Sequence, residues 1–195
     1  DGQDDLALGG GNPSSSYYST GRSYVLDGGS TLTGSVSSSS YAARVEGDDD
    51  YDCAYQSVLA DLDGDGVAEL VVGSPFDNYG SDWSSDYDAG SVSVFEGASG
   101  SDDLGDATDR ISGEDDYNYF GYSLTYGDLD GDGLDDIIAS SPGYNGSSSD
   151  HGAVWIVNGN SSLSWDSRVD DAAEAMIEGD SYDLDLGLDT LARPG

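Results

Sequence analysis

The chain has 195 residues and carries 40 acidic against five basic side chains, which gives a formal net charge of −35 at pH 7. Nucleic acids and anionic membrane surfaces would repel such a chain, so we expect neither as a partner. With 29 glycines and only 36% hydrophobic residues, the composition is typical of a protein rich in turns and poor in helix.

Intrinsic disorder and salt adaptation are the alternative explanations of this composition. Low hydrophobicity with high net charge is a signature of disorder, but 14 tyrosines and regularly spaced aliphatic runs supply residues that can form a core. Salt adaptation would explain the acidity, but not the aspartate spacing described below. The single cysteine, Cys53, excludes an intrachain disulfide, and no apolar run approaches the length of a membrane span.

Residues 1–44 form the first of three related segments. Their opening, DGQDDLALGGGNP, aligns with DGVAELVVGSP from Asp65 and DGLDDIIASSP from Asp132, so Asp1 matches those two aspartates. A Gly-led alternating run, GRSYVLDG, follows at Gly21. This segment lacks the first half of the aspartate-rich sequence that the later segments contain.

Residues 45–110 and 111–176 are two complete copies of one unit. The first contains VEGDDDYD, DLDGDGVAELVVGSP and GSVSVFEG, and the second contains ISGEDDYN, DLDGDGLDDIIASSP and GAVWIVNG in the same order. The aspartate-rich sequences start at residues 61 and 128, 67 residues apart. Residues 177–195 begin a further repeat, because IEGDSYDLDLG matches ISGEDDYNYFG, and we expect an N-terminal segment to complete it.

Short runs such as AELVVGS, SVSVF and AVWIV are rich in β-branched and aromatic residues and are bounded by Gly, Ser, Asp and Asn. They predict an all-β fold with about four antiparallel strands in each unit. A short helix at residues 170–177, DDAAEAMI, is the main exception. A solenoid, a sandwich and a propeller blade all fit this density of strands.

The two aspartate-rich loops, residues 61–69 and 128–136, have the pattern of a calcium site. Carboxylates stand at loop positions 1, 3, 5 and 9, position 7 can add a main-chain carbonyl, and intervening glycines permit sharp turns. Such an all-oxygen set with room for water suits Ca²⁺ better than Zn²⁺ or Mg²⁺. The predicted ligands are Asp61, Asp63, Asp65, Val67 and Glu69, then Asp128, Asp130, Asp132, Leu134 and Asp136.

Two other interpretations of these loops are less consistent with the sequence. An EF-hand would have a bidentate acid at position 12, where Val72 and Ala139 stand. A metal-free hairpin would leave four carboxylates within nine residues to repel one another, in both loops. Asp1 and Asp5 occupy positions 5 and 9 of a third, half-complete loop and are further candidate ligands.

These residues resemble the FG-GAP repeats of integrin α-subunit propellers and of many secreted bacterial proteins. The calcium loop, strand and GSP or SSP turn carry the resemblance, and the Phe-Gly element is present as Phe120-Gly121. It weakens to Leu186-Gly187 and is replaced by Ala54-Tyr55, where we expect Cys53 and Tyr55 to fill the space. The resemblance implies β-propeller-type blades, with a ring that is open or completed by other copies, because three blades are too few to close one.

The resemblance also implies a calcium-stabilised extracellular or cell-surface protein with a structural or adhesive role. The incomplete units at the two ends predict head-to-tail self-association into a ring or filament. The alternatives are a propeller module that binds a protein or glycan ligand, and accessory repeats of a larger secreted enzyme.

We expect no catalytic activity from this chain itself. Its one histidine, His151, lies in a polar sequence where we predict an exposed loop residue. Seven aromatic residues in predicted loops are candidates for sugar or protein contacts, with blade packing as the alternative: Tyr17, Tyr18, Tyr79, Trp83, Tyr87, Tyr144 and Trp165.

Overall fold

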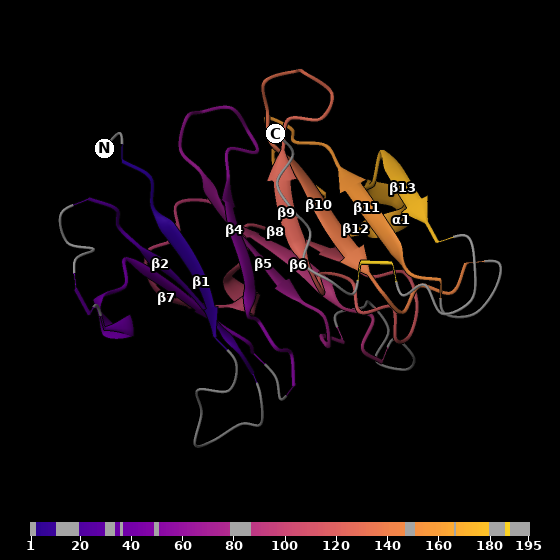
Figure 1. The fold of residues 1–195 in the computed structure, drawn as a ribbon, viewed down its shortest axis with the longest axis horizontal. Helices are drawn as coiled ribbons and strands as arrows, with labels where there is room; N and C mark the ends of the chain where they lie inside the picture. The colour runs from indigo at the N-terminus through magenta and orange to yellow at the C-terminus, as the bar shows by residue number, and fades with distance from the viewer. Residues whose placement is uncertain are drawn as a thin grey trace.

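The computed structural model confirms a nearly all-β fold, with 13 strands in three sheets among the residues that it describes (Figure 1). It describes residues 3–10, 20–29, 34–35, 37–48, 51–78, 87–146, 151–165, 167–179 and 186–187. The first sheet has the strand order β1-β2-β3-β7, formed by Leu6–Gly10, Arg22–Leu26, Ala43–Glu46 and Gly100–Asp103.

The second and third sheets are formed mainly by strands of the two complete units of the sequence. The second has the order β12-β8-β6-β5-β4, formed by Ser167–Arg168, Asp109–Ser112, Ser91–Phe95, Glu69–Ser74 and Gln56–Ala60. The third has the order β13-β11-β10-β9, formed by Ala175–Glu178, Ala153–Val157, Asp136–Ser141 and Leu124–Gly127. Four strands in each of these sheets are antiparallel neighbours, as the sequence predicts.

The three sheets follow one another in chain order across the molecule, like successive blades (Figure 1). Strand β5 in the middle sheet is buried along its whole length, because Val71 faces the third sheet while Leu70 and Val72 face the first. A strand covered on both sides needs a continuous apolar run, which ELVVGS provides. Within the described residues the three sheets do not close into a ring.

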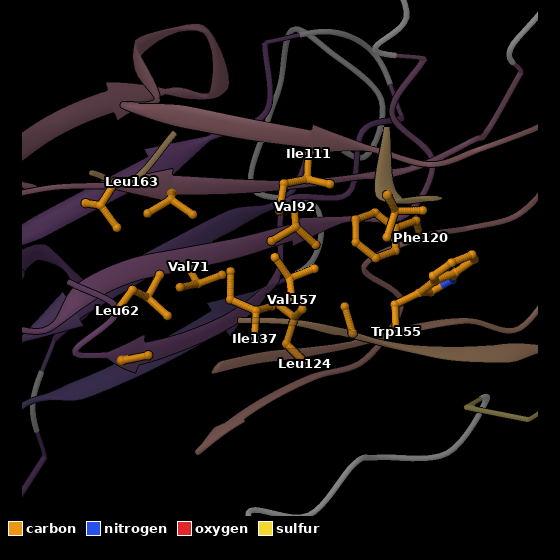
Figure 2. Close-up of a cluster of buried hydrophobic side chains, with 14 of the residues drawn as sticks. Leu62, Val71, Val92, Ile111, Phe120, Leu124, Ile137, Trp155, Val157 and Leu163 are labelled. Carbon is orange, nitrogen blue, oxygen red and sulfur yellow. The ribbon is translucent and has the colours of Figure 1, made fainter. Parts of the chain in front are cut away.

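A large hydrophobic core fills the space between the second and third sheets (Figure 2). Phe120 is fully buried in this core, next to Val92 and Ile111 of the second sheet and Trp155 of the third. Tyr144 packs edge-on against Trp155, with ring centroids 5.5 Å apart. Burial of these aromatic side chains is therefore a main contribution to the contact between the two sheets.

A smaller core joins the first and second sheets. Ala54, which occupies the position of Phe120, is fully buried there, and the aromatic ring of this core comes from Phe95 instead. Phe95 lies at the end of β6, where the next unit has Val157. Cys53 and Tyr55 are only partly buried and belong to neither core, so the expectation that they replace the missing ring is wrong.

The connection between the third and fourth strands of a unit reaches back to the preceding sheet. Strand β7 pairs in parallel with β3, and β12 pairs in parallel with β8. A short helical turn follows each: η2, Leu104–Asp106, with its capping Asp103, and α1, Val169–Ala172. Each turn begins with a buried aliphatic residue, Leu104 or Val169, which packs into a core between sheets.

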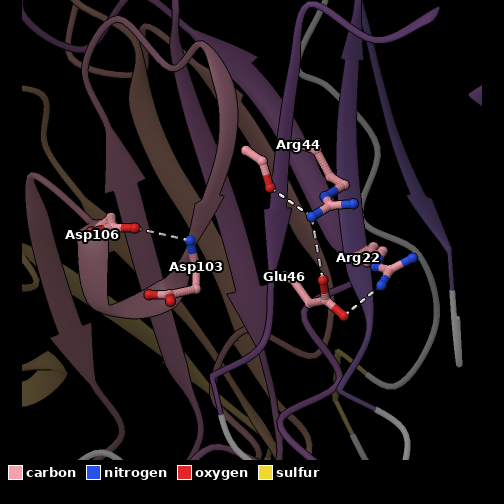
Figure 3. A network of polar contacts seen from close by, with 6 residues as sticks. Arg22, Arg44, Glu46, Asp103 and Asp106 are labelled. Atoms are coloured by element: carbon pink, nitrogen blue, oxygen red, sulfur yellow. Dashed lines mark hydrogen bonds and ion pairs between the residues drawn. The ribbon is translucent and has the colours of Figure 1, made fainter. Parts of the chain in front are cut away.

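Polar contacts also hold the first of these connections (Figure 3). Arg44 on β3 donates a 2.6 Å hydrogen bond to Ser101 of β7, and its guanidinium lies 3.6 Å from the carboxylate of Glu46. Arg22 on β2 forms a 2.6 Å ion pair with Glu46. These groups are partly exposed, so they fix the register of the connection more than they add to stability.

The helix predicted at residues 170–177 is mostly wrong. Only residues 169–172 are helical, and residues 175–178 form β13, which pairs with β11. The alanine-rich sequence favours a helix locally, but pairing with a neighbouring strand overrides that propensity. A short 3-10 turn, η1, Ser38–Ser40, stands at the corresponding place in the first unit.

The sequence units and the sheets are out of phase. The boundaries at 44/45 and 110/111 fall inside β3 and β8, the fourth strands of the first two units. Of the segment 177–195, only residues 177–179 and 186–187 are described, and Leu186 bridges to Gly152 as Phe120 bridges to Gly90. No helix in the described part of the chain is long and apolar enough to cross a bilayer.

Candidate metal centres in the aspartate-rich loops

The two aspartate-rich loops occupy the same place in their sheets. Residues 61–68 connect β4 to β5, and residues 128–135 connect β9 to β10. The last acid of each loop, Glu69 or Asp136, is the first residue of the strand that follows. One position of each loop is therefore anchored in a buried strand, while the others lie nearer the surface.

In the first loop, Asp61, Asp63 and Glu69 bring one carboxylate oxygen each to within 4.8 Å of one another. Main-chain N–H groups orient all three: Gly64 donates to Asp61 at 2.9 Å, Asp65 donates to Asp63 at 2.9 Å, and Leu62 donates to Glu69 at 2.8 Å. The loop thus holds its carboxylates around a common point.

The second loop repeats this arrangement with Asp128, Asp130 and Asp136, again within 4.8 Å of one another. Gly131 donates to Asp128 at 2.6 Å, Asp132 donates to Asp130 at 3.0 Å, and Leu129 donates to Asp136 at 2.7 Å. Position by position, these are the bonds of the first loop. The repeated sequence therefore produces a repeated geometry, with the same three positions converging.

Positive backbone angles at two glycines of each loop make this geometry accessible. Gly64 and Gly66 have φ of 79° and 87°, and Gly131 and Gly133 have φ of 82° and 95°. A side chain at these positions would be strained, because L residues other than glycine rarely adopt such angles. The DGDG sequence in each loop is explained by this turn.

The family model of the FG-GAP repeat matches residues 54–95 and 120–157 of the chain. Both segments are FG-GAP repeats. Each begins at the position of the Phe-Gly element, contains one complete loop and ends with the third strand of its sheet, β6 or β11. The match therefore covers both candidate metal centres and supports the propeller-type fold.

A curated relative also matches part of the chain. The phosphatidylinositol-glycan-specific phospholipase D of Dictyostelium discoideum is 41% identical over 70 residues, which are 35% of this chain and 7% of that protein. The chain therefore corresponds to a small part of that relative's length.

Not every predicted ligand lies in the two clusters. Asp65 and Asp132 are exposed, and each accepts a hydrogen bond from the main chain two residues later, at Val67 or Leu134. Asp5, in the incomplete first unit, accepts a 2.8 Å hydrogen bond from the Gly28 N–H. Asp1 lies outside the described residues.

The chemistry of each cluster fits a hard cation. All three candidate ligand atoms in each cluster are carboxylate oxygens, and Glu69 and Asp136 are only 2% and 1% exposed. Burial raises the pKa of Glu69 to about 7; the Leu62 hydrogen bond opposes this shift, and the charges of Asp61, Asp63 and Asp65 add to it. None of the ion pairs among the described residues involves a cluster carboxylate, so a bound cation would relieve their repulsion.

Sequence reasoning missed three residues that support the second loop. Asn158 donates a 3.0 Å hydrogen bond to Asp130, and the Gly159 N–H donates to Asp136 at 3.1 Å. Asp135 contacts the first loop directly. The signal for Gly159 was available, because a Gly follows the third strand in every unit, at Gly28, Gly97 and Gly159.

The remaining predicted residues have mixed outcomes. His151 is only 7% exposed, so the prediction of an exposed loop residue is wrong. The Leu186 N–H donates a hydrogen bond to the His151 carbonyl, and the Glu178 carboxylate lies 3.6 Å from the His151 ring. Tyr144 and Trp165 pack against the large core, whereas Tyr87 is 63% exposed. Tyr17, Tyr18, Tyr79 and Trp83 lie outside the described residues.

Proposed function

We propose that this chain is a calcium-stabilised, non-catalytic propeller module of an extracellular or cell-surface protein, with a structural or adhesive role. The observation that carries the proposal is the pair of matched carboxylate clusters, one in each FG-GAP repeat, each with a buried donor at the start of a strand. Bound Ca²⁺ would neutralise the carboxylates and fix the turn into that strand, so metal binding would contribute to folding.

Calorimetric titration with CaCl₂ tests this proposal. We expect two sites, with dissociation constants near the 10⁻⁴–10⁻³ M that is roughly typical of extracellular calcium modules. Asp63→Ala and Asp130→Ala should each remove one site. Asp102→Ala, which removes an acidic residue of β7 outside both clusters, should keep two. A stoichiometry that is the same in all four proteins would contradict the assignment of the loops.

Head-to-tail association is the form of structural role that we propose. Strand β5 pairs with the edge strand β4, and β10 pairs with the edge strand β9. Strand β1 aligns with β5 and β10 in the sequence, but it pairs only with β2 in the described part of the chain. Leu6 and Leu8 on β1 are 44% and 43% exposed. A second copy of this chain is the proposed partner of β1.

Sedimentation of the same protein distinguishes the structural role from a monomeric ligand-binding module. We expect the assembled mass to increase with protein concentration in excess Ca²⁺, and the substitution of the exposed Leu8 on β1, Leu8→Lys, to prevent this. A calcium-saturated wild type that stays monomeric would contradict the self-association while leaving calcium binding intact.

A role as accessory repeats of a larger enzyme is the second candidate. Its support is the 70-residue similarity to part of a phosphatidylinositol-glycan-specific phospholipase D. In that case the chain would stabilise or position a catalytic domain encoded in the same gene. Both candidate functions use the calcium loops, and they differ in whether a catalytic domain accompanies the repeats.

A further inference from the structure

The two candidate metal loops touch each other through one pair of residues. The main-chain N–H of Asp61 donates a 3.0 Å hydrogen bond to the Asp135 carboxylate, and the Asp135 N–H donates a 2.9 Å hydrogen bond to the Asp61 carbonyl. Both polar groups of the Asp61 main chain are thus held by one residue of the other loop. These bonds join the second sheet to the third.

Both residues of this pair are directly linked to a cluster. Asp61 is itself a member of the first cluster, with its carboxylate also oriented by the Gly64 N–H. Asp135 immediately precedes Asp136, the buried member of the second cluster. A change in the position of Asp136 therefore reaches Asp61 through the one peptide bond between Asp135 and Asp136 and two hydrogen bonds.

Side-chain packing supports the same contact. A Cβ at Gly64 would lie 2.5 Å from Leu134, and a Cβ at Gly159 would lie 2.5 Å from the Asp135 carbonyl and 2.7 Å from the Leu62 carbonyl. The first loop, the second loop and the turn after β11 are therefore in close contact. Such a contact leaves little room for one loop to move independently of the other.

We propose that Asp135 couples the two loops, so that a cation bound in residues 128–136 increases the cation affinity of residues 61–69. This inference rests on the proposed calcium binding. A cation in the second loop would order Asp135 and Asp136, and Asp61 would then lose less conformational entropy when its own loop binds a cation. By linkage, a cation in the first loop raises the affinity of the second by the same factor.

The chain contains its own reference for the role of Asp135. The corresponding position of the first loop, position 8, holds Ala68, which is exposed. Asp135→Ala therefore reproduces a residue that an FG-GAP loop of this chain already accepts. Asp135→Asn removes the same charge but keeps a side-chain oxygen that can accept the Asp61 N–H, so the two variants differ in the hydrogen bond and not in net charge.

The experiment is a cycle of calcium titrations by calorimetry. Asp130→Ala leaves only the first loop, and Asp63→Ala leaves only the second, so these variants give the two separate association constants. In the wild type, the product of the two stepwise association constants should exceed the product of the separate ones by about fivefold or more, the low end of common coupling factors. The same cycle is measured in Asp135→Ala and Asp135→Asn backgrounds.

We expect the coupling factor to fall well below the wild-type value in the Asp135→Ala background, where only the main-chain bond from the Asp135 N–H remains, and to persist in the Asp135→Asn background. A wild-type factor of one would overturn the coupling, as would equal factors in the wild type and in Asp135→Ala. Loss of coupling in Asp135→Asn, with its far-ultraviolet circular dichroism unchanged, would overturn the role of the hydrogen bond. Absence of any calcium binding by the wild type would instead reject the proposed function.

Discussion

Arg110→Ala should lower the free energy of unfolding by about 3–5 kcal/mol, the usual cost of removing one partner of a buried ion pair. Arg110 on β8 pairs with Asp77, which follows β5, and both side chains are almost fully buried. Ser91 at the start of β6 donates to the same Asp77 oxygen. Because the group joins three parts of the second sheet, its loss leaves a buried carboxylate without its cation.

The electrostatics of Asp77 explain why this effect should be large. Burial raises the pKa of Asp77 even though Arg110 and Ser91 both act to lower it. Without Arg110, the ionised carboxylate would keep its desolvation cost and lose its main compensation. Urea unfolding followed by circular dichroism, in excess Ca²⁺, measures the change.

Arg44→Ala is the matched control for this prediction. Arg44 is also a strand arginine beside a carboxylate, Glu46, but both side chains are about one quarter exposed. We expect a loss of roughly 1 kcal/mol or less, as for other exposed ion pairs. Equal losses of unfolding free energy in the two variants would contradict the claim that burial makes the Arg110–Asp77 pair the more important of the two.

Phe120→Ala should also lower the free energy of unfolding by about 3–5 kcal/mol. The Phe120 ring is fully buried in the core between the second and third sheets, and the residue is held by a 2.9 Å hydrogen bond from its N–H to the Ala89 carbonyl. Truncation would leave a cavity where two sheets meet. A Cβ at the adjacent Gly121 would lie 2.5 Å from the Ser91 carbonyl oxygen, so the backbone there is closely packed and has little room to shift and close the gap.

Two variants at matched positions test this prediction by urea unfolding. Phe120→Leu introduces the residue that the chain has at Leu186, and we expect a smaller loss because most of the volume is kept. Phe95→Ala in the smaller core should be strongly destabilising too, since Phe95 supplies the ring where Ala54 replaces phenylalanine. A Phe95→Ala variant as stable as the wild type would contradict this account of the smaller core.

The predictable part of the fold comes from local patterns. Strands β5, β6, β10 and β11 are apolar, β-branched runs bounded by Gly and Asp, and the DGDG sequences require the positive φ angles that the loops show. Convergence of Asp61, Asp63 and Glu69 follows from the alternate spacing of acids around a turn. These features need no knowledge of distant contacts, so the sequence is sufficient for them.

The features that the sequence did not predict depend on contacts between segments that are distant in the sequence. Residues 175–178 form a strand because β11 offers an edge, despite the helix-favouring alanines. The backward pairing of β7 with β3, and of β12 with β8, involves polar residues without a strand-like pattern. Burial of His151 and the contact of Asp135 with Asp61 likewise depend on how sheets pack, which local periodicity does not encode.

Thermal unfolding with and without calcium tests the central claim most directly. At a free Ca²⁺ concentration about 100-fold above the dissociation constant, each occupied loop should stabilise the chain by about 2.7 kcal/mol. Chelation at constant ionic strength should therefore lower the unfolding temperature markedly, and an Asp63→Ala/Asp130→Ala variant should show no calcium response. An unfolding temperature of the wild type that does not change on chelation would contradict the claim that these FG-GAP loops are calcium sites that stabilise the fold.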